Sequence, residues 1–369
     1  MANPLVALQE FDQSFWYDNI RRNFLEDGTI QRLIEADGLR GITSNPSIFE
    51  KAIGSSDDYD DQLAALAGSE TDTEEIYEAL ALADIRQACD LFADLYEETG
   101  KQDGFVSLEV SPHLAHDTAG TIAAARRLYA AVGRPNVMIK VPATAAGIPA
   151  IETLIGLGLN INITLMFSMA HYEAVAQAYS NGLRHWLNQG GEPGQVASVA
   201  SFFVSRVDTA VDKQLETIDT PTAAGLRGKV AIANSKVVYQ RFREIFHGAA
   251  FADLARAGCN VQRLLWASTS TKNPDYPDTL YIDALIGPQT VNTMPPETVD
   301  AFRDHGTVAP SLTTAVAEAH WVLEQLPALS LDFEAITEQL QADGVAAFSR
   351  SFDALLDAVA KKLQQFDSA

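Results

Sequence analysis

The sequence is poor in cysteine and in basic residues. Only two cysteines, Cys89 and Cys259, occur in 369 residues, and neither lies in a CxxC pair. Disulfide frameworks and cysteine-based zinc sites are therefore not expected, and a reducing compartment fits this composition. The 26 Lys and Arg residues stand against 49 Asp and Glu residues, which gives a net charge of −23. Nucleic acids and anionic membranes bind basic surfaces, so neither is expected as a partner.

Signatures of secretion, membrane insertion and metal binding are also missing. The first 13 residues contain no basic segment followed by an apolar core, and no apolar run approaches the length of a membrane span. The histidines form no metal pattern, because His113 and His116 have no carboxylate at ligand spacing. We therefore expect a soluble, cytoplasmic protein without a metal site. A phosphorylated substrate remains possible, because two or three local Arg or Lys residues can hold a phosphate.

Apolar, β-branched segments alternate with segments of helical periodicity along most of the chain. The predicted strands are 14–20, 39–44, 105–110, 137–142, 160–167, 196–204, 229–234 and 263–269. The predicted helices include 29–36, 57–67, 74–97, 117–131, 146–156, 168–188, 206–218 and 235–248. Strands that read as continuous apolar runs between helices are typical of a covered parallel sheet. Eight such units predict a (β/α)8 TIM barrel. A doubly wound sheet is the alternative, but the G-x-G-x-x-G turn that it usually carries is absent.

Additional helices are expected at both ends of the barrel sequence. Residues 3–8 predict a short helix, Thr29 is a plausible N-cap, and Asn45-Pro46 signals a turn or a helix start. A polar loop, 270–296, follows the last predicted strand, and helices are expected at about 311–326 and 345–365. We expect one barrel domain over residues 1–369, with C-terminal helices at about 311–365 packing on the barrel.

One lysine stands apart from the other eight because it lies within an apolar strand. Lys140 is in the middle of the run VMIKVP at 137–142. A buried ammonium is costly unless it is paired or loses its proton. A lysine made partly neutral is a nucleophile toward carbonyl carbons. Lys140 is therefore a candidate for Schiff-base formation. The alternative is a salt-bridged core lysine, or an edge-strand lysine whose ammonium reaches water.

Polar side chains recur near the carboxyl ends of six predicted strands, where TIM-barrel enzymes build their sites. Alternation along each strand shows which positions share the barrel interior. These positions are Asp18, Thr43, Asn45, Glu109, Lys140, Asn162, Thr164 and Ser201. Their matching height predicts one site in which Glu109 and Asp18 balance the charge of Lys140 and transfer protons. A buried polar network that only specifies the fold is the alternative.

Basic residues that could bind a phosphate follow the later strands. Arg206 comes directly after the strand predicted at 196–204, and Lys272 lies in the loop after 263–269. Ser268 and Ser270 add hydroxyl donors next to Lys272. Phosphate sites of TIM barrels often lie near the loops of the last strands, which makes this group a candidate phosphate site.

Five of these segments, in this order, resemble the signature segments of the transaldolase family. They are 14–22 (SFWYDNIRR), 41–49 (GITSNPSIF), 106–110 (VSLEV), 138–144 (MIKVPAT) and 160–165 (NINITL). The resemblance implies a class I aldolase-type barrel that needs no metal or cofactor. It implies transfer of a dihydroxyacetone unit between sugar phosphates in the non-oxidative pentose phosphate pathway. The donors would be sedoheptulose 7-phosphate or fructose 6-phosphate, and the acceptors glyceraldehyde 3-phosphate or erythrose 4-phosphate.

The resemblance also implies a role for each matching position. Lys140 matches the Schiff-base lysine, and Asp18 matches the acid/base that takes the substrate hydroxyl proton during carbon–carbon cleavage. Glu109 and Thr164 match a pair that holds a catalytic water for imine formation and hydrolysis. The implied contacts to the donor chain are Thr43, Asn45, Asn162 and Ser201, and the implied phosphate contacts are Arg206 and Ser268.

The sequence departs from the family pattern at a second phosphate-binding arginine. Residues 267–273 read ASTSTKN, with Lys272 in place of that arginine. Lysine holds a phosphate as a point charge, without the bidentate fork of arginine. Two other functions remain open: a lyase that releases free dihydroxyacetone, and a non-catalytic sugar-phosphate-binding barrel. The second would be expected to lose members of the polar ring, whereas Lys140, Asp18 and Glu109 are all present. Either a monomer or a homodimer is compatible with the sequence.

Overall fold

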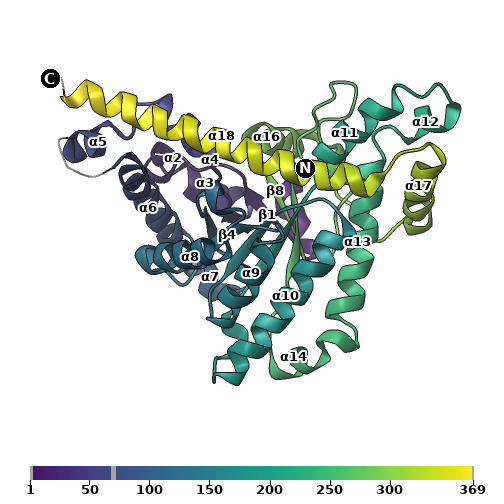
Figure 1. Cartoon of the computed structure of the whole chain (residues 1–369), viewed down its shortest axis with the longest axis horizontal. Coiled ribbons are helices and arrows are strands. Elements are labelled where there is room, and N and C mark those ends of the chain that lie inside the picture. The colour runs from purple at the N-terminus through teal and green to yellow at the C-terminus, as the bar shows by residue number, and fades with distance from the viewer. Residues whose placement is uncertain (1–2, 68–71, 368–369) are drawn as a thin grey trace.

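A closed barrel of parallel strands forms the centre of the protein (Figure 1). The computed structural model describes residues 3–67 and 72–367. Within these residues eight strands follow one another around the barrel in chain order, which confirms the predicted (β/α)8 fold. They are β1 (Gln13–Tyr17), β2 (Leu39–Ile42), β3 (Phe105–Glu109), β4 (Val137–Pro142), β5 (Ile161–Met166), β6 (Ser198–Phe203), β7 (Arg263–Ala267) and β8 (Thr290–Met294).

Helices connect the strands and form the outer layer of the barrel. The first half of the chain contributes α1 (Pro4–Ala7), η1 (Leu8–Phe11), α2 (Arg22–Glu26), α3 (Thr29–Asp37), α4 (Pro46–Gly54), α5 (Asp60–Leu66), α6 (Thr73–Leu91), α7 (Ala93–Glu98), η2 (Pro112–Leu114), α8 (Thr118–Val132), α9 (Gly147–Gly156) and α10 (Met169–Asn188). The second half contributes η3 (Pro193–Gln195), α11 (Ser205–Leu215), α12 (Pro221–Leu226), α13 (Val230–Phe246), η4 (Ala249–Phe251), α14 (Ala252–Ala257), α15 (Leu280–Asp283), α16 (Pro296–His305), α17 (Val316–Ala328) and α18 (Phe333–Asp367).

Strand register sets the height of the central polar side chains. Glu109 on β3 is paired with Lys140 on β4, and Lys140 is paired with Asn162 on β5. Every residue of β4 and β5 is buried, as their continuous apolar pattern predicts for strands covered by helices. Three neighbouring strands therefore bring a carboxylate, an amine and an amide to one level near the carboxyl end of the barrel.

The predicted seventh strand is wrong. Residues 229–234 belong to the start of α13, and the strand predicted at 263–269 is the seventh strand of the barrel. The backbone N–H of Ala231, in the first turn of α13, donates to the Asp208 carboxylate at 2.7 Å. A carboxylate at that place satisfies a free N–H of the helix and interacts favourably with its dipole. This cap comes from a residue 23 positions earlier, so the local apolar pattern could not reveal it.

The true eighth strand lies within the segment predicted as a loop. β8 has the sequence TVNTM, and all five residues are buried. Its Thr and Asn content is typical of a loop when it is read in isolation. Pairing with both β1 and β7 makes these residues part of the closed barrel. The loop that carries Lys272 consequently follows β7, with β8 coming after it.

Two predicted helix starts differ from the observed ones. Gly28, and not Thr29, is the N-cap of α3, and the Thr29 N–H donates to Asp27 at 2.8 Å. Asn45 does start a helix, because its side chain accepts from the N–H of Ile48 at the beginning of α4. The last helix begins at Phe333, well before the predicted residue 345.

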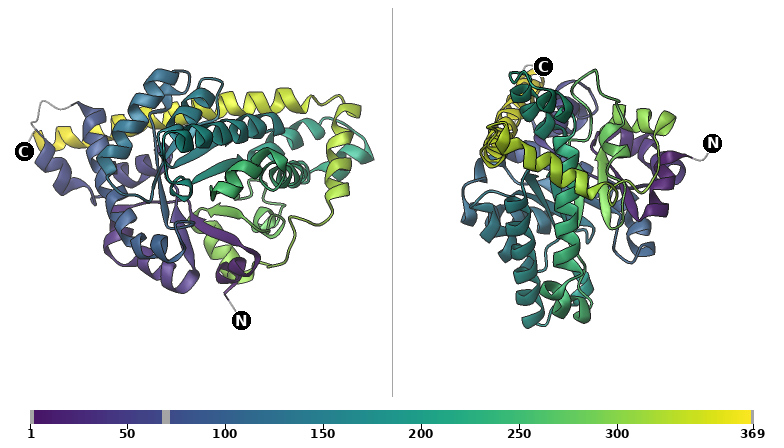
Figure 2. Two further views of the ribbon diagram at one scale, coloured as in Figure 1. Left: turned by 90° about the horizontal axis from the view of Figure 1, so that it is seen from below. Right: turned by 90° about the vertical axis from the view of Figure 1, so that its right-hand side faces the viewer.

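Helix α18 crosses the molecule over the carboxyl ends of the central strands. Figure 1 shows it as a long yellow helix, and Figure 2 shows that the N-terminal segment lies on the far side of the barrel. The side chain of Gln341 donates to the carbonyls of Ala143, just after β4, and of Leu165, on β5. Helix α18 therefore contacts the barrel at the end where the polar side chains gather.

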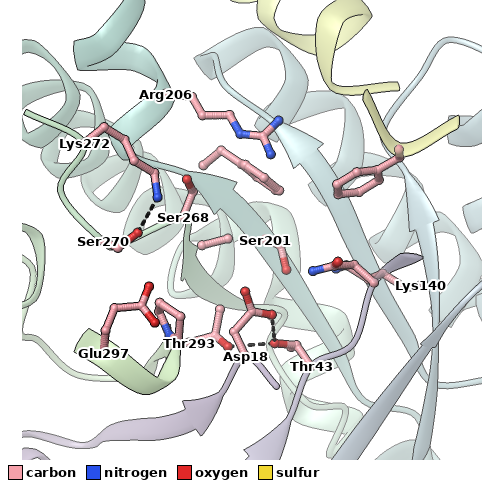
Figure 3. A pocket seen from close by; sticks show the side chains of 15 residues that line it. Asp18, Thr43, Lys140, Ser201, Arg206, Ser268, Ser270, Lys272, Thr293 and Glu297 are labelled. Atoms are coloured by element: carbon pink, nitrogen blue, oxygen red, sulfur yellow. Dashed lines mark hydrogen bonds between the residues drawn. The ribbon is translucent and has the colours of Figure 1, made fainter. Parts of the chain in front are cut away.

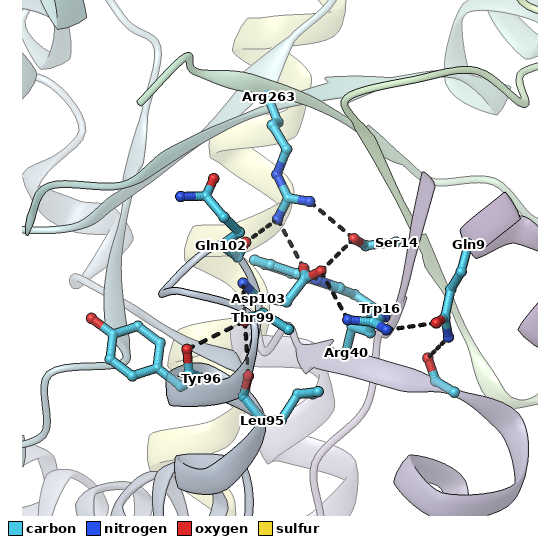
Figure 4. Close-up of polar contacts among 11 residues, drawn as sticks. Gln9, Ser14, Trp16, Arg40, Leu95, Tyr96, Thr99, Gln102, Asp103 and Arg263 are labelled. Atoms are coloured by element: carbon cyan, nitrogen blue, oxygen red, sulfur yellow. Dashed lines mark hydrogen bonds and ion pairs between the residues drawn. The ribbon is translucent and has the colours of Figure 1, made fainter. Parts of the chain in front are cut away.

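The opposite end of the barrel is closed by a buried polar network (Figure 4). Asp103, only 5% exposed, precedes β3 and accepts from Ser14 at 2.7 Å and from the Trp16 indole at 3.2 Å. Arg263 at the start of β7 donates to Asp103 at 2.9 Å and to Ser14 at 2.9 Å. Arg40 lies 3.7 Å from the same carboxylate. Both oxygens of Asp103 thus have partners on several strands, and the network ties those strands together.

Residues 3–67 and 72–367 contain neither a membrane-spanning helix nor a cluster of metal-binding side chains. No helix there has the length and apolarity required to span a membrane. No group of three or more His, Cys, Asp or Glu side chains there is arranged to hold a metal ion.

Candidate active site

A cavity of about 230 Å³ opens at the carboxyl end of the barrel (Figure 3). Nine of the residues selected from the sequence line it: Asp18, Thr43, Asn45, Lys140, Ser201, Arg206, Ser268, Ser270 and Lys272. Figure 3 shows Lys140 and Thr43 toward one side of this space and Arg206 and Lys272 toward the other. The remaining three candidates, Glu109, Asn162 and Thr164, do not line the cavity and lie next to its lining residues.

Lys140 projects from β4 into the cavity and is only 5% exposed. Its Nζ donates to the backbone carbonyl of Ser44 at 3.2 Å. The Glu109 Oε2 is 3.8 Å away, which is an ion-pair distance but too long for a good hydrogen bond. The ring of Phe348 lies 5.8 Å from the same nitrogen. The amine is therefore buried and held loosely, with one moderate hydrogen bond and one carboxylate close by.

Glu109 ends β3 beside Lys140, and its environment favours the protonated form. Burial raises the pKa of Glu109 from 4.5 to about 7, and the Lys140 ammonium only partly offsets that rise. Within the described residues Glu109 Oε2 has no hydrogen-bond partner. A carboxyl group that titrates near neutral pH can both donate and accept a proton under physiological conditions. Glu109 is thus suited to proton transfer next to the lysine.

Asp18 lies just beyond β1 and is held by a chain of threonines. The Thr43 hydroxyl donates to Asp18 Oδ1 at 2.6 Å and lies 2.8 Å from the Thr293 hydroxyl. The backbone N–H of Asp18 donates to Met294 O at 2.9 Å, which fixes its position against β8. One carboxylate oxygen is engaged by Thr43, and the other remains available to a ligand in the cavity. Thr43 therefore orients the carboxylate in addition to lining the cavity.

Asn45 and Ser201 face the cavity while bonding to their own surroundings. The Asn45 side-chain oxygen caps α4, so its amide nitrogen is the group left to donate to a ligand. Ser201 on β6 donates to Asn162 at 2.7 Å, and the Asn162 amide donates to Ser107 at 3.0 Å. Asn162 is fully buried beneath Ser201. Through these hydrogen bonds Asn162 holds the Ser201 side chain in position.

Thr164 is fully buried on β5, where it is paired with Pro142 of β4. Its hydroxyl has no hydrogen-bond partner among residues 3–67 and 72–367. A buried hydroxyl without a partner is costly, and a bound water is the usual way to satisfy it. Glu109 on β3 and Thr164 on β5 thus each have a buried oxygen without a hydrogen-bond partner among the described residues, and both strands are adjacent to β4.

The basic side of the cavity is built from the ends of β6 and β7. The Arg206 guanidinium, in the first turn of α11, lies over the Phe203 ring at 5.2 Å and forms no ion pair within the described part of the chain. Burial lowers the pKa of Arg206 from its ordinary value. Ser268 has a left-handed backbone, with φ of 55°, and its hydroxyl lies 2.9 Å from that of Ser205. Strained backbone of this kind is common at ligand sites.

Lys272 faces the same space from the loop between β7 and β8. Its Nζ donates to the Ser270 hydroxyl at 2.6 Å and is exposed to solvent. Two buried contacts fix this loop against α11: Tyr276 donates to Asp212 at 2.6 Å, and Tyr281 donates to Asp208 at 2.9 Å. The loop that carries Lys272 and the helix that carries Arg206 are thus joined outside the cavity.

Six lining residues were not predicted as site residues: Phe203, Ala267, Thr293, Pro295, Glu297 and Phe348. Thr293 belongs to the missed strand β8, and Glu297 follows it at the cavity mouth. Phe348 was assigned only to the apolar stripe of the last helix, which by itself indicates core packing. His113, which has no carboxylate at metal-ligand spacing in the sequence, pairs with Asp353 on α18 at 2.8 Å. That partner is 240 residues away in sequence, so local spacing could not find it.

The fold and the cavity together define a (β/α)8 barrel with an internal lysine flanked by carboxylates and with cationic side chains at the far side. Residues 15–359 match the family described as Transaldolase/Fructose-6-phosphate aldolase. The chain belongs to this family.

Curated relatives cover almost the whole chain. A protein of Thiobacillus denitrificans named Transaldolase is 49% identical over 354 residues, 96% of this chain and 99% of its own. Transaldolase 2 of Nostoc sp. is 45% identical over 98% of both chains. Transaldolase 1 of Streptomyces coelicolor is 45% identical over 98% of this chain and 95% of its own. The similarity therefore includes the barrel, the cavity and α18.

Proposed function

We propose that this chain is a transaldolase, a transferase that moves a dihydroxyacetone unit from a ketose phosphate to an aldose phosphate. The donors are sedoheptulose 7-phosphate or fructose 6-phosphate, and the acceptors glyceraldehyde 3-phosphate or erythrose 4-phosphate, as in the non-oxidative pentose phosphate pathway. The observation that carries the proposal is the single cavity that holds Lys140, Asp18 and Arg206. Family membership and relatives named as transaldolases support the same function.

Lys140 is the proposed nucleophile. Its neutral amine attacks the ketose carbonyl carbon, the carbinolamine loses water, and an iminium joins the sugar to the enzyme. Glu109, 3.8 Å from Lys140 and titrating near neutral pH, supplies and accepts protons in these steps through a water held with Thr164. The two unpartnered buried oxygens of Glu109 and Thr164 support such a water.

Asp18 is the proposed base for carbon–carbon cleavage. It takes the proton from the hydroxyl next to the breaking bond, the aldose leaves, and the bonding electrons pass into the iminium to give an enamine on Lys140. Thr43 holds the carboxylate in place through its 2.6 Å hydrogen bond. The acceptor aldehyde then forms the new bond to the enamine carbon, and Asp18 returns the proton to its oxygen. Water adds to the iminium carbon that results, the C–N bond breaks, and the new ketose phosphate leaves the free Lys140 amine.

The cationic side of the cavity is proposed to hold the substrate phosphate. Arg206, Ser268 and Lys272 converge there, and Thr43, Asn45 and Ser201 contact the donor chain, with Asn162 behind Ser201. Arg206→Lys keeps the charge but loses the planar fork, so the KM for fructose 6-phosphate should rise roughly tenfold. Unphosphorylated fructose is the control substrate. It has no phosphate to contact Arg206, so its low turnover should be the same in the variant and in the wild type.

Composition supports the remaining proposals about the chain. The acidic net charge of −23 and the two isolated cysteines are consistent with a cytoplasmic enzyme that acts on small sugar phosphates, without a nucleic-acid or membrane partner. We also propose that residues 1–369 form one domain and work as a monomer or a homodimer.

The proposal is tested by trapping the iminium with borohydride in the presence of fructose 6-phosphate, followed by peptide mass mapping. A reduced three-carbon adduct on Lys140 is expected, and Lys140→Met is the control that should show none. A protein that binds the sugar but forms no adduct would overturn the Schiff-base assignment. A coupled assay with and without erythrose 4-phosphate separates transferase from lyase. Equal release of free dihydroxyacetone without acceptor would favour the lyase.

A further inference from the structure

Helix α18 presents one face to the site. Gln341, Gly344 and Phe348 follow helical spacing, so all three side-chain positions lie on one side of the helix. Gln341 bonds to residues at the strand ends, Gly344 lies close to the Leu165 side chain, and the Phe348 ring faces the Lys140 amine. The three residues of α18 have no role in the transfer steps proposed above.

Phe348 forms an apolar wall directly beside the reactive nitrogen. Its ring centre lies 5.8 Å from Lys140 Nζ, the side chain is only 6% exposed, and it lines the cavity. The polar side chains of Asp18, Thr43 and Ser201 line the same space. An aromatic ring at this place excludes water from one side of the amine while its face still accommodates a positive charge.

Gln341 and Gly344 set the position of this wall. The Gln341 amide donates at 3.0 Å to both Ala143 O and Leu165 O, and the strands there are joined by Ala143 N–H to Thr164 O at 2.8 Å. Leu165 has a left-handed backbone with φ of 62°, so its carbonyl is turned away from the regular ladder. A Cβ on Gly344 would lie 2.8 Å from Leu165 Cδ2 and 3.7 Å from Arg206 Nη1. Glycine therefore lets α18 approach the Leu165 side chain on β5, while the distance to Arg206 is an ordinary contact.

The helix is also fixed on both sides of this face. Glu338 pairs with His171 at 2.8 Å, Ser351 accepts from Ser47 at 2.7 Å, and Lys362 pairs with Asp60 at 2.6 Å. These contacts are made with α10, α4 and α5, which surround the barrel end. Phe348 is accordingly a fixed part of the cavity wall, because its helix is anchored before and after it.

We propose that Phe348, positioned by Gln341 and Gly344, determines whether the enamine on Lys140 is passed to an aldose or lost to water. The inference rests on the proposed transaldolase function. In transfer, the enamine carbon forms a bond to the acceptor aldehyde carbon, whose oxygen takes the proton from Asp18. In the loss reaction that carbon takes a proton from water; water then adds to the iminium carbon, the C–N bond breaks, and dihydroxyacetone and the free amine result. Both routes end when water hydrolyses an iminium and frees the Lys140 amine, but only the second route needs water at the enamine carbon. Keeping water from that carbon therefore suppresses only the second route.

The test is the ratio of free dihydroxyacetone released to aldose phosphate converted, at saturating fructose 6-phosphate and erythrose 4-phosphate. Phe348→Ala should raise this ratio about tenfold or more, because the opened wall admits water. Phe352→Ala is the matched control on the same helix. Phe352 is equally buried but packs on Tyr77 and His113, each with ring centres 5.7 Å away. It should lower the melting temperature and leave the ratio unchanged.

Two further variants keep the proposal falsifiable if Phe348→Ala fails to fold. Phe348→Leu keeps an apolar side chain but leaves part of the wall open, so its ratio should lie between wild type and the expected alanine value. Gln341→Met keeps the volume and removes both hydrogen bonds, and a smaller rise of about two- to fivefold is expected from the shift of the wall. An unchanged ratio in folded Phe348 variants overturns the proposal. A wild-type protein with neither adduct nor transfer would instead overturn the proposed function.

Discussion

The two ends of the barrel use buried polar groups in opposite ways. At the amino end, Asp103 is satisfied by Ser14, Trp16 and Arg263, and its charge is balanced. At the carboxyl end, Lys140 has one 3.2 Å hydrogen bond, and both Glu109 and Thr164 have an oxygen without a partner among the described residues. Both ends are similarly buried, so burial alone does not distinguish a structural network from a reactive one.

The two ends of the barrel differ in how many buried donors and acceptors still lack a hydrogen-bond partner among the described residues. A polar network whose bonds are complete holds the strands together and has no bonding capacity for a ligand. Groups held next to one another with free donors and acceptors are costly to the folded state, and a substrate or water can satisfy them. The amino end therefore has the properties of a network that specifies the fold, and the carboxyl end has those expected of a ligand site.

The largest expected effect is on catalysis from Asp18→Asn. The amide cannot act as the proposed base, so turnover should fall by roughly 10²–10⁴-fold. Borohydride trapping should still give an adduct on Lys140, because imine formation does not use this carboxylate. The melting temperature should change little, since Asp18 is only partly buried. Unchanged turnover in a steady-state assay would show that Asp18 has no catalytic role.

The same substitution at the other end should affect stability instead. Asp103→Asn removes the charge that balances Arg263 and leaves a buried guanidinium without its partner. Unfolding free energy should fall by about 3–5 kcal/mol. Urea unfolding measures this loss, and turnover per folded molecule should equal that of wild type. A tenfold fall in turnover of the folded variant would remove the distinction between the two ends.

A smaller effect is expected in the pH dependence of stability. The folded state raises the pKa of Glu109 from 4.5 to about 7, so it binds a proton that the unfolded chain releases in this window. The stability contributed by protonated Glu109 is fully present below about pH 4.5 and is lost as pH rises through 7. Glu109→Gln should reduce the fall in unfolding free energy across this range by roughly 3 kcal/mol. Identical pH profiles of the two proteins would contradict the raised value.

The smallest expected effect concerns the loop that carries Lys272. Tyr276→Phe removes the 2.6 Å hydrogen bond to Asp212 that joins this loop to α11. Loss of about 1 kcal/mol should raise the KM for fructose 6-phosphate two- to fivefold, with kcat nearly unchanged. Tyr179→Phe is the control, because its hydroxyl bonds to Asn260 O at 2.8 Å away from the cavity. Equal KM changes in both variants would show that the loop contact does not position the phosphate site.

The sequence predicts best where a local pattern decides the structure. The strand around Lys140 is a continuous apolar run, and its predicted limits, 137–142, agree with β4. β8 escaped detection because TVNTM becomes strand only by pairing with β1 and β7. The start of α13 was read as a strand because its cap, Asp208, comes from another helix. Similarly, nothing local to Phe348 shows that its ring faces Lys140.

The contacts of α18 also place the completion of this cavity late in synthesis. Gln341 bonds to residues 198 and 176 positions earlier, and Ser351 bonds to Ser47 across 304 positions. A growing chain therefore has all eight strands available before the wall beside Lys140 can form. Contacts of such long range are slow to form and come after local structure. We expect the lysine to lie open to water on the ribosome until Phe348 has emerged.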